Sequence, residues 1–245
     1  ASDIRRGNEI TAQLDFILAR ARYGYSMKAV AAIPQTSADS TRPEDVSREH
    51  RLVNARHPLL GRDATPITVN IGPDWSILVV TGPNTGGKTV AMKTVGLLTL
   101  MHQSGLMVPC EESTQLPIVD GVYADIGDEQ EIRQNLSTFA SHLVRIRGAL
   151  ELATERSPVL LDELGGGTDP EEGAALGEAV LEDLLKRDVP TLCSTHIGKL
   201  KEFAYRRLRV ENARTMFSAG YAEGGEIQPP NDVKEMVLAP IFGGH

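Results

Sequence analysis

Apolar residues follow two alternating patterns through most of the chain. Short runs rich in Val, Ile and Leu are typical of buried strands in a parallel sheet, and they predict strands at 76–82, 121–127, 158–164 and 190–196. Apolar positions at helical spacing predict helices between these runs, at 88–104, 137–155 and 171–187. Strands that alternate with helices indicate an α/β fold with a mostly parallel sheet flanked by helices.

The first 50 residues follow different patterns. Four apolar residues share one face at helical spacing: Ile10, Leu14, Ile17 and Ala21. They predict an amphipathic helix over 8–22, which we interpret as the end of a longer helical region. From Ile33 to Arg48 the sequence is polar and contains prolines, which indicates a linker. We therefore expect a helical segment over 1–32, a linker over 33–50 and a main domain from residue 51.

Composition narrows the class of protein. Hydrophobic residues make up 41% of the 245 residues, enough for a sizeable core, and no apolar run is long enough to cross a bilayer. The two cysteines, Cys110 and Cys193, lack metal-ligand spacing and suit a reducing compartment. The net charge of -8 argues against a broad nucleic-acid surface. We expect a cytoplasmic piece of a longer protein, without membrane contact and with any DNA contact elsewhere in the parent chain.

A glycine-rich stretch after the first of these strands, TGPNTGGKTV, carries the clearest chemical motif. It fits the pattern G-x-x-x-x-G-K-[ST], in which backbone N–H groups turn inward around phosphate oxygens at the start of a helix. The predicted phosphate-binding residues are Gly82, Pro83, Asn84, Thr85, Gly86, Gly87, Lys88 and Thr89. Lys88 is expected to reach the β- and γ-phosphates of ATP, and the Thr89 hydroxyl to bind Mg²⁺.

A second strand end supplies two carboxylates. The run VLLDE delivers Asp162 and Glu163 to the carboxyl edge of the sheet, where ligands bind in open α/β folds. We expect Asp162 to hold Mg²⁺ through water. Glu163 is the candidate general base for an attacking water, a role worth about 10² to 10⁴ in rate. The structural alternative is a polar strand end without chemistry.

Two further motifs allow both a structural and a functional interpretation. In NLSTFASHL, Ser137 begins a helix and could be an N-cap, yet a hydroxyl at an exposed helix N-terminus also suits a γ-phosphate presented by another molecule. In STHIGKL, His196 closes an apolar strand, where a lone histidine is usually structural. Beside a phosphate loop and an acidic strand end, it is also a candidate γ-phosphate sensor.

Together these motifs resemble a known family. The segments TGPNTGGKT, STF, LLDELGGGTDPEEGAAL and STH, with NARHPLL before them, are similar to the ATPase domain of the MutS family within the ABC ATPase superfamily. More specifically, they resemble the second bacterial MutS class, which lacks the mismatch-reading domain and usually carries a C-terminal small-MutS-related nuclease domain. The resemblance covers 1–217 and implies a P-loop NTPase fold of ABC ATPase type over 51–217, preceded by the helical segment.

The resemblance implies a role for each motif. Lys88 and Thr89 match the Walker A motif, and Asp162 and Glu163 match Walker B. The other matched positions are Gln130 in the Q-loop at the metal site, Ser137 as the signature serine, Thr168 and Asp169 in the D-loop, His196 in the H-loop, and Arg56, His57 and Pro58 at the entry to the domain. The implied catalytic residues are therefore Glu163, His196 and Lys88, with Ser137 and Asp169 at the nucleotide.

In this family two such domains face each other head to tail, so that each ATP lies between the phosphate loop of one and the signature helix of the other. The implied function is Mg²⁺-dependent ATP hydrolysis in a homodimer, which controls binding of the parent protein to branched or recombining DNA and restrains recombination. A non-catalytic nucleotide switch and a ribosome-associated ATPase are the alternatives. A transporter energy module is disfavoured, because the chain reads NLSTF where such modules carry an LSGGQ-type signature.

The end of the chain departs from the family pattern. Residues 218–245 are rich in Gly and Pro, whereas the family continues there through a β-hairpin into a helix-turn-helix region that helps dimerisation. We expect 218–245 to be an atypical tail, disordered or non-native, and the dimer to be weakened. The nuclease domain is absent, so no nuclease activity is expected of this piece.

Overall fold

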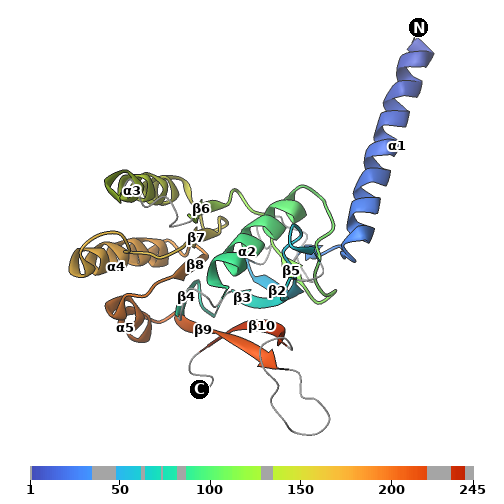
Figure 1. Cartoon of the computed structure of the whole chain (residues 1–245). Helices are drawn as coiled ribbons and strands as arrows, with labels where there is room; N and C mark the ends of the chain where they lie inside the picture. The colour runs from blue at the N-terminus through green and yellow to red at the C-terminus, as the bar shows by residue number, and fades with distance from the viewer. Residues whose placement is uncertain are drawn as a thin grey trace, which may run out of the picture.

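The computed structural model describes residues 2–34, 48–61, 64–72, 74–81, 87–127, 135–219 and 233–240. These residues form one 10-stranded sheet and five helices (Figure 1). The helices are α1 Ser2–Ser26, α2 Lys88–Gln103, α3 Asn135–Leu152, α4 Pro170–Lys186 and α5 Gly198–Arg206. The strands are β1 Ile33–Pro34, β2 His50–Ala55, β3 Ile67–Ile71, β4 Ile77–Thr81, β5 Gln115–Leu116, β6 Tyr123–Asp125, β7 Val159–Leu161, β8 Thr191–Ser194, β9 Val210–Ala219 and β10 Val233–Pro240.

The sheet has a parallel half and a mixed half. Its strand order is β1-β5-β2-β3-β10-β9-β4-β8-β7-β6. Neighbouring strands from β9 to β6 are all parallel. In the other half, β2 is antiparallel to β3 and β5, and β10 is antiparallel to β9. The predicted α/β fold with a parallel sheet flanked by helices is confirmed, and the mixed half extends it.

Both faces of the central strand β4 are buried, which explains its continuous apolar run. Because successive side chains point to opposite faces, Ile77 and Val79 belong to one core cluster and Leu78 and Val80 to the other. The first cluster includes buried residues of α3, α4 and α5, and the second includes those of α2. Figure 1 shows α2 apart from the group of α3, α4 and α5. The sheet is therefore covered by helices on both faces.

Helix α1 is longer than the predicted 8–22 and projects away from the sheet (Figure 1). Its apolar face is not covered, since Ile10, Leu14 and Ile17 are 50%, 55% and 58% exposed. Gly24 near its C-terminal end is buried, and a Cβ there would lie 2.8 Å from the Met107 sulfur. Helix α1 thus meets the domain through its last turns. No helix in the described ranges is both long and apolar enough to cross a membrane.

Only some of the predicted segments fall within the described residues. Most of the predicted linker, 35–47, lies outside the described residues, as do 220–232 and 241–245 of the predicted tail. Within the predicted tail, residues 233–240 form β10, and the expectation of a disordered or non-native tail stays a prediction. This strand pairs antiparallel to β9 and parallel to β3, so it satisfies backbone groups that would otherwise lie on exposed strand edges. The division of the chain into domains stays a prediction.

Candidate nucleotide-binding site

The predicted site residues follow strands that end at one edge of the parallel half. The phosphate loop follows β4, Asp162 follows β7, and His196 lies just beyond β8. Strand β8 lies between β4 and β7 in the sheet. The end of β8 is therefore placed between the end of β4 and Asp162. Residues 82–86 of the loop lie outside the described residues, and the description resumes at Gly87.

Helix α2 begins directly after the loop, and its N-terminus is suited to binding an anion. Gly87 is its N-cap residue with φ 74° and ψ 14°, a left-handed conformation that glycine adopts without strain. No side chain caps this N-terminus, and its first turn contains no acidic residue. The first N–H groups of the helix and its dipole can therefore serve a phosphate group.

Lys88, the first residue of α2, is buried beside two acids. Only 3% of the surface of this residue is exposed. Burial lowers the pKa of the ammonium group, the negative charges of Asp162 and Glu163 raise it, and the positive charge of Lys201 lowers it. These charges place Lys88 near Asp162 and Glu163, as the sequence motifs predict.

Asp162 lies at the centre of the site and uses both carboxylate oxygens. Its Oδ2 accepts a hydrogen bond from Thr89 Oγ1 at 2.6 Å, and its Oδ1 accepts one from Ser194 Oγ at 2.5 Å. The same Ser194 hydroxyl accepts a hydrogen bond from the Glu163 N–H at 2.9 Å. Thr89 and Asp162, predicted from separate motifs, therefore meet in the fold.

The Thr89 hydroxyl and the Asp162 carboxylate fit Mg²⁺, which prefers oxygen ligands and is usually bound by one or two carboxylates, waters and substrate phosphates. Within the described ranges, no group of three or more His, Cys, Asp and Glu residues could hold a metal ion. Gln130, the other predicted metal ligand, lies outside the described residues.

Glu163 has an unusual backbone conformation. Its φ is 52°, in the left-handed region that residues other than glycine rarely adopt. The Glu163 carbonyl accepts a hydrogen bond from Gly166 N at 2.8 Å, which closes a turn after Asp162. Such strain persists only where surrounding contacts hold it. The Ser194 hydroxyl is one of these contacts, because it holds the Glu163 N–H.

The loop after Glu163 packs directly on helix α4. A Cβ on Gly165 would lie 2.6 Å from the Gly173 carbonyl oxygen, so only glycine permits this approach. Asp169 is the N-cap of α4 and accepts hydrogen bonds from the N–H groups of Glu171 at 2.9 Å and Glu172 at 3.4 Å. The structure thus gives Asp169 a local capping role, and nucleotide binding by Asp169 stays a prediction.

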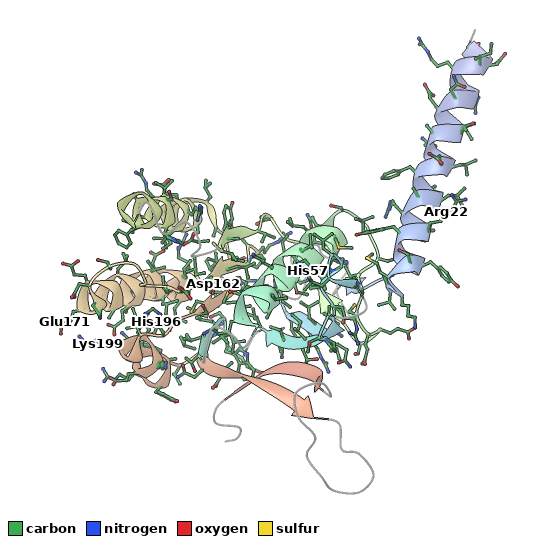
Figure 2. The ribbon with its side chains drawn as sticks, viewed as in Figure 1. Arg22, His57, Asp162, Glu171, His196 and Lys199 are labelled. Atoms are coloured by element: carbon green, nitrogen blue, oxygen red, sulfur yellow. The ribbon has the colours of Figure 1, made fainter. Side chains whose placement is uncertain are left out.

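His196 lies at the border of the site. It is exposed and follows Thr195, whose buried hydroxyl donates to the Leu164 carbonyl at 3.0 Å. A Cβ on Gly166 would lie 3.7 Å from His196 Cε1, so the ring is next to the loop that follows Asp162. Figure 2 shows Asp162 beside α2 and His196 towards α4 and α5. This position suits a sensor of bound nucleotide, and that role stays a prediction.

Asp125 adds a contact that we did not predict as part of the site. This residue ends β6 and is buried, and its carboxylate accepts hydrogen bonds from His142 Nδ1 at 2.7 Å and an Arg145 guanidinium nitrogen at 2.8 Å. Its carbonyl accepts the Asp162 N–H at 2.8 Å. Both donors belong to α3, the helix that begins near Ser137. The Asp125 cluster, defined as Asp125, His142 and Arg145, therefore connects α3 with the strand end at Asp162.

Ser137 is described only in part, whereas Arg56 and His57 at the domain entry are described in full. Helix α3 begins at Asn135, so Ser137 lies in its first turn, but the Ser137 side chain lies outside the described residues.

Near the domain entry, Figure 2 shows His57 beside α2. Burial, and then the positive charge of Lys93, lowers the pKa of His57. Arg56 is fixed by its N–H, which donates to the Pro109 carbonyl at 2.8 Å, and by a guanidinium contact with the Ala64 carbonyl.

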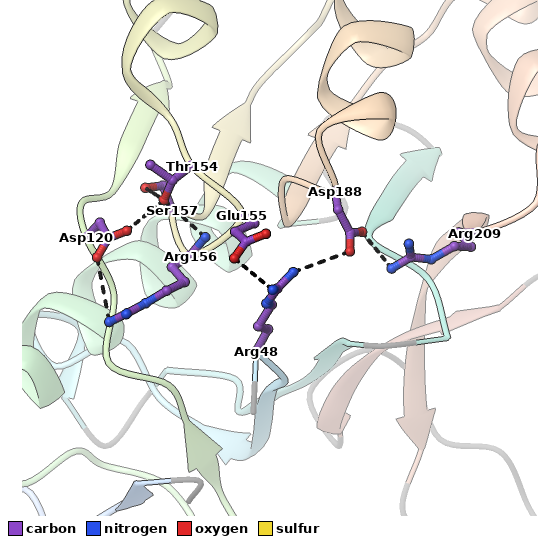
Figure 3. Close-up of polar contacts among 8 residues, drawn as sticks. All are labelled: Arg48, Asp120, Thr154, Glu155, Arg156, Ser157, Asp188 and Arg209. Atoms are coloured by element: carbon purple, nitrogen blue, oxygen red, sulfur yellow. Dashed lines mark hydrogen bonds and ion pairs between the residues drawn. The ribbon is translucent and has the colours of Figure 1, made fainter. Parts of the chain in front are cut away.

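The opposite edge of the sheet carries ion pairs instead (Figure 3). Arg48 pairs with Glu155 at 2.7 Å and with Asp188 at 3.5 Å, and Asp188 also pairs with Arg209 at 2.6 Å. These residues precede β2, β7, β8 and β9, so the ion pairs join the amino ends of strands. Each side chain is partly exposed, and such pairs are typically worth about 0.2–1 kcal/mol. We interpret this edge as structural.

Comparisons with known proteins give a consistent result. Residues 78–236 match the family described as MutS domain V. The chain is 49% identical over 219 residues to the "Endonuclease MutS2" of Pelotomaculum thermopropionicum, which covers 89% of this chain and 27% of that protein. It is 47% identical over 210 residues to the "Putative endonuclease MutS2" of Bacillus subtilis, which covers 85% of this chain and 26% of that protein. The chain thus spans only a minor part of the length of these relatives.

Proposed function

Because the chain belongs to the MutS family and contains its ATPase domain, MutS domain V, we propose that it binds and hydrolyses ATP with Mg²⁺. One observation carries the proposal most directly. The Thr89 hydroxyl of the phosphate-loop helix and the Asp162 carboxylate lie 2.6 Å apart, with Lys88 buried close by and Glu163 next in sequence. Groups whose chemistry suits phosphate binding, metal binding and proton acceptance therefore lie close together, which supports the proposal.

In this proposal each residue has a defined task. The N–H groups at the start of α2 and the Lys88 ammonium bind the phosphates, and Glu163 accepts a proton from the attacking water. His196 donates a hydrogen bond to a γ-phosphate oxygen. Bound Mg²⁺ would neutralise the phosphate charge, with Thr89 and Asp162 as its protein ligands. The strained turn at Glu163 supports its role, because strained backbone conformations cluster at active sites.

The proposal extends to a second copy of the chain. Ser137 in the first turn of α3 would contact the ATP bound by the partner, so that a homodimer forms two composite sites. ATP binding and turnover would then control the binding of branched or recombining DNA by parts of the parent protein beyond this chain, and so restrain recombination in the cytoplasm. We assign to this chain the ATPase activity and not the endonuclease activity in the names of its relatives, since it covers about a quarter of their length.

The test of this function is Glu163→Gln, which removes the proton acceptor with little change in shape. We expect nucleotide affinity within about twofold of the unmodified chain and a turnover rate lower by about 10²-fold or more. Lys88→Ala is the comparison, because it should lose nucleotide binding itself. Equilibrium binding of a fluorescent ATP analogue and phosphate release measure the two quantities. Unchanged turnover by Glu163→Gln would exclude Glu163 as the base, and a chain without measurable turnover would favour a non-catalytic nucleotide switch.

A further inference from the structure

Ser194, the last residue of β8, lies between the two acids of the site. It is fully buried, at 0% exposure, in a strand whose other residues are also buried. Its hydroxyl is 2.5 Å from Asp162 Oδ1 and 2.9 Å from the Glu163 nitrogen. A hydroxyl buried in an apolar strand costs free energy unless it forms hydrogen bonds. Both of its contacts are with the residues that carry the proposed chemistry.

The chemistry of these groups fixes the direction of each hydrogen bond. An ionised carboxylate can only accept, so the Ser194 hydroxyl donates its proton to Asp162. The Glu163 N–H can only donate, so the Ser194 oxygen accepts from it. One hydroxyl therefore satisfies an acceptor on Asp162 and a donor on Glu163 at the same time.

These contacts have a different consequence for each acid. With Oδ1 held by Ser194, the Asp162 carboxylate is oriented so that Oδ2 faces Thr89. At Glu163, the hydrogen bond holds a backbone with φ 52°, a conformation that is unfavourable for this residue without supporting contacts. Ser194 thus fixes the metal-facing oxygen of one acid and the backbone of the other.

We propose that Ser194 is a positioning residue that orients Asp162 towards Mg²⁺ and Glu163 towards the attacking water. This inference rests on the proposed function, since it assigns Ser194 to the same site. The residue acts through its neighbours and need not touch the nucleotide. Groups that orient metal ligands in this way typically change metal affinity or activity by about 10- to 100-fold when removed.

The test compares three variants of the full chain. Ser194→Ala removes the hydroxyl, and Ser194→Thr retains one at the same position. Ser157→Ala is the matched control, because Ser157 is also a fully buried serine whose hydroxyl has a partner, Thr154 Oγ1 at 3.1 Å, but it lies at the opposite edge of the sheet (Figure 3). Nucleotide affinity is measured with and without Mg²⁺, and turnover is measured at saturating ATP and Mg²⁺.

The inference predicts a specific pattern. In Ser194→Ala, nucleotide affinity without Mg²⁺ stays within about twofold, whereas the Mg²⁺ concentration for half-maximal effect rises and turnover falls, each by about tenfold or more. Ser194→Thr recovers at least part of the Mg²⁺ response and of the turnover, and Ser157→Ala changes neither of these two quantities. Equal losses of affinity with and without Mg²⁺, or the same effects in Ser157→Ala, would show a merely structural serine and overturn the inference. Absence of turnover in the unmodified chain would instead refute the proposed function, while the Mg²⁺-dependent affinity would still test Ser194.

Discussion

Three buried polar side chains lie in the candidate site: Lys88 begins α2, Asp162 directly follows β7, and Ser194 ends β8. Burial of such groups is unfavourable unless their hydrogen bonds and charges are compensated. Asp162 meets this requirement with one hydrogen bond to each oxygen, from Thr89 and from Ser194. The apolar strands thus set the positions of these polar groups, and the polar groups set each other's orientation.

His50 at the start of β2 provides a pH test at the residue scale. Burial lowers its pKa to about 4, the hydrogen bond with the Arg48 carbonyl raises it, and the charge of His102 lowers it. Because the folded-state pKa lies below the ordinary value of 6.5, the unfolded chain binds the proton first as pH falls. The contribution of His50 to stability is therefore complete above pH 6.5 and is lost as pH falls from 6.5 to about 4.

The expected loss is on the order of 3 kcal/mol in the free energy of unfolding. Urea unfolding from pH 7 to pH 4 measures it, with His50→Leu as the comparison, because leucine cannot titrate. The variant should show a shallower decrease over this range, whatever its stability at pH 7. An identical pH dependence in both proteins would contradict the assignment to His50.

At the scale of elements, the accuracy of the sequence predictions depends on where each signal lies. The phosphate-loop strand β4 and helices α2 and α4 begin and end within a few residues of their predicted limits, because apolar runs and helical spacing are local signals. Helix α5 was not predicted, and its N-cap Ile197 forms no side-chain cap, so the usual start signal is missing. Strand β1 is two residues long and pairs with β5 about 80 residues later, which local pattern cannot predict.

The same distinction holds for the site. Lys88, Thr89, Asp162 and Glu163 stand in contiguous motifs, so the sequence alone predicts them as site residues. The roles of Ser194 and of the Asp125 cluster come from strands and helices that meet only in the fold. An acid at a strand end, as in GVYADIG, is a usable signal, but its partners on α3 cannot be chosen from sequence alone.

The Asp125 cluster makes a prediction about helix α3. Arg145→Gln should weaken the attachment of α3 to the buried Asp125 carboxylate, and with it the contact that leads to Asp162. We expect about 1 kcal/mol or more of lost stability and a several-fold lower turnover, since hydrogen bonds to buried charges are the stronger ones. Urea unfolding and phosphate release measure these effects.

Arg147→Gln on the same helix is the control. Arg147 pairs with Glu151 at 2.6 Å, but both side chains are largely exposed, and solvent screens such a pair so that it adds little stability. This variant should therefore retain turnover and nearly all stability. If the two variants behave alike, the Asp125 cluster has no special connection with the site.

At the scale of the whole molecule, the two edges of the parallel half of the sheet carry different groups. Its carboxyl edge carries the phosphate-loop helix and the acids, and its amino edge carries the ion pairs around Arg48 (Figure 3). Helix α3 contacts Asp125 at the carboxyl edge through His142 and Arg145, and its first turn precedes these residues in the chain. The proposed composite site requires two copies to face each other through these edges.

The most direct test is the rate of ATP hydrolysis per chain, measured with Mg²⁺ over a wide range of protein concentration, together with sedimentation with and without ATP. If each site is shared between two copies, the rate per chain rises with protein concentration and levels off as ATP-dependent dimers form. A rate per chain that is constant across the range, from a protein that sediments as a monomer with ATP bound, would contradict a site shared between two copies.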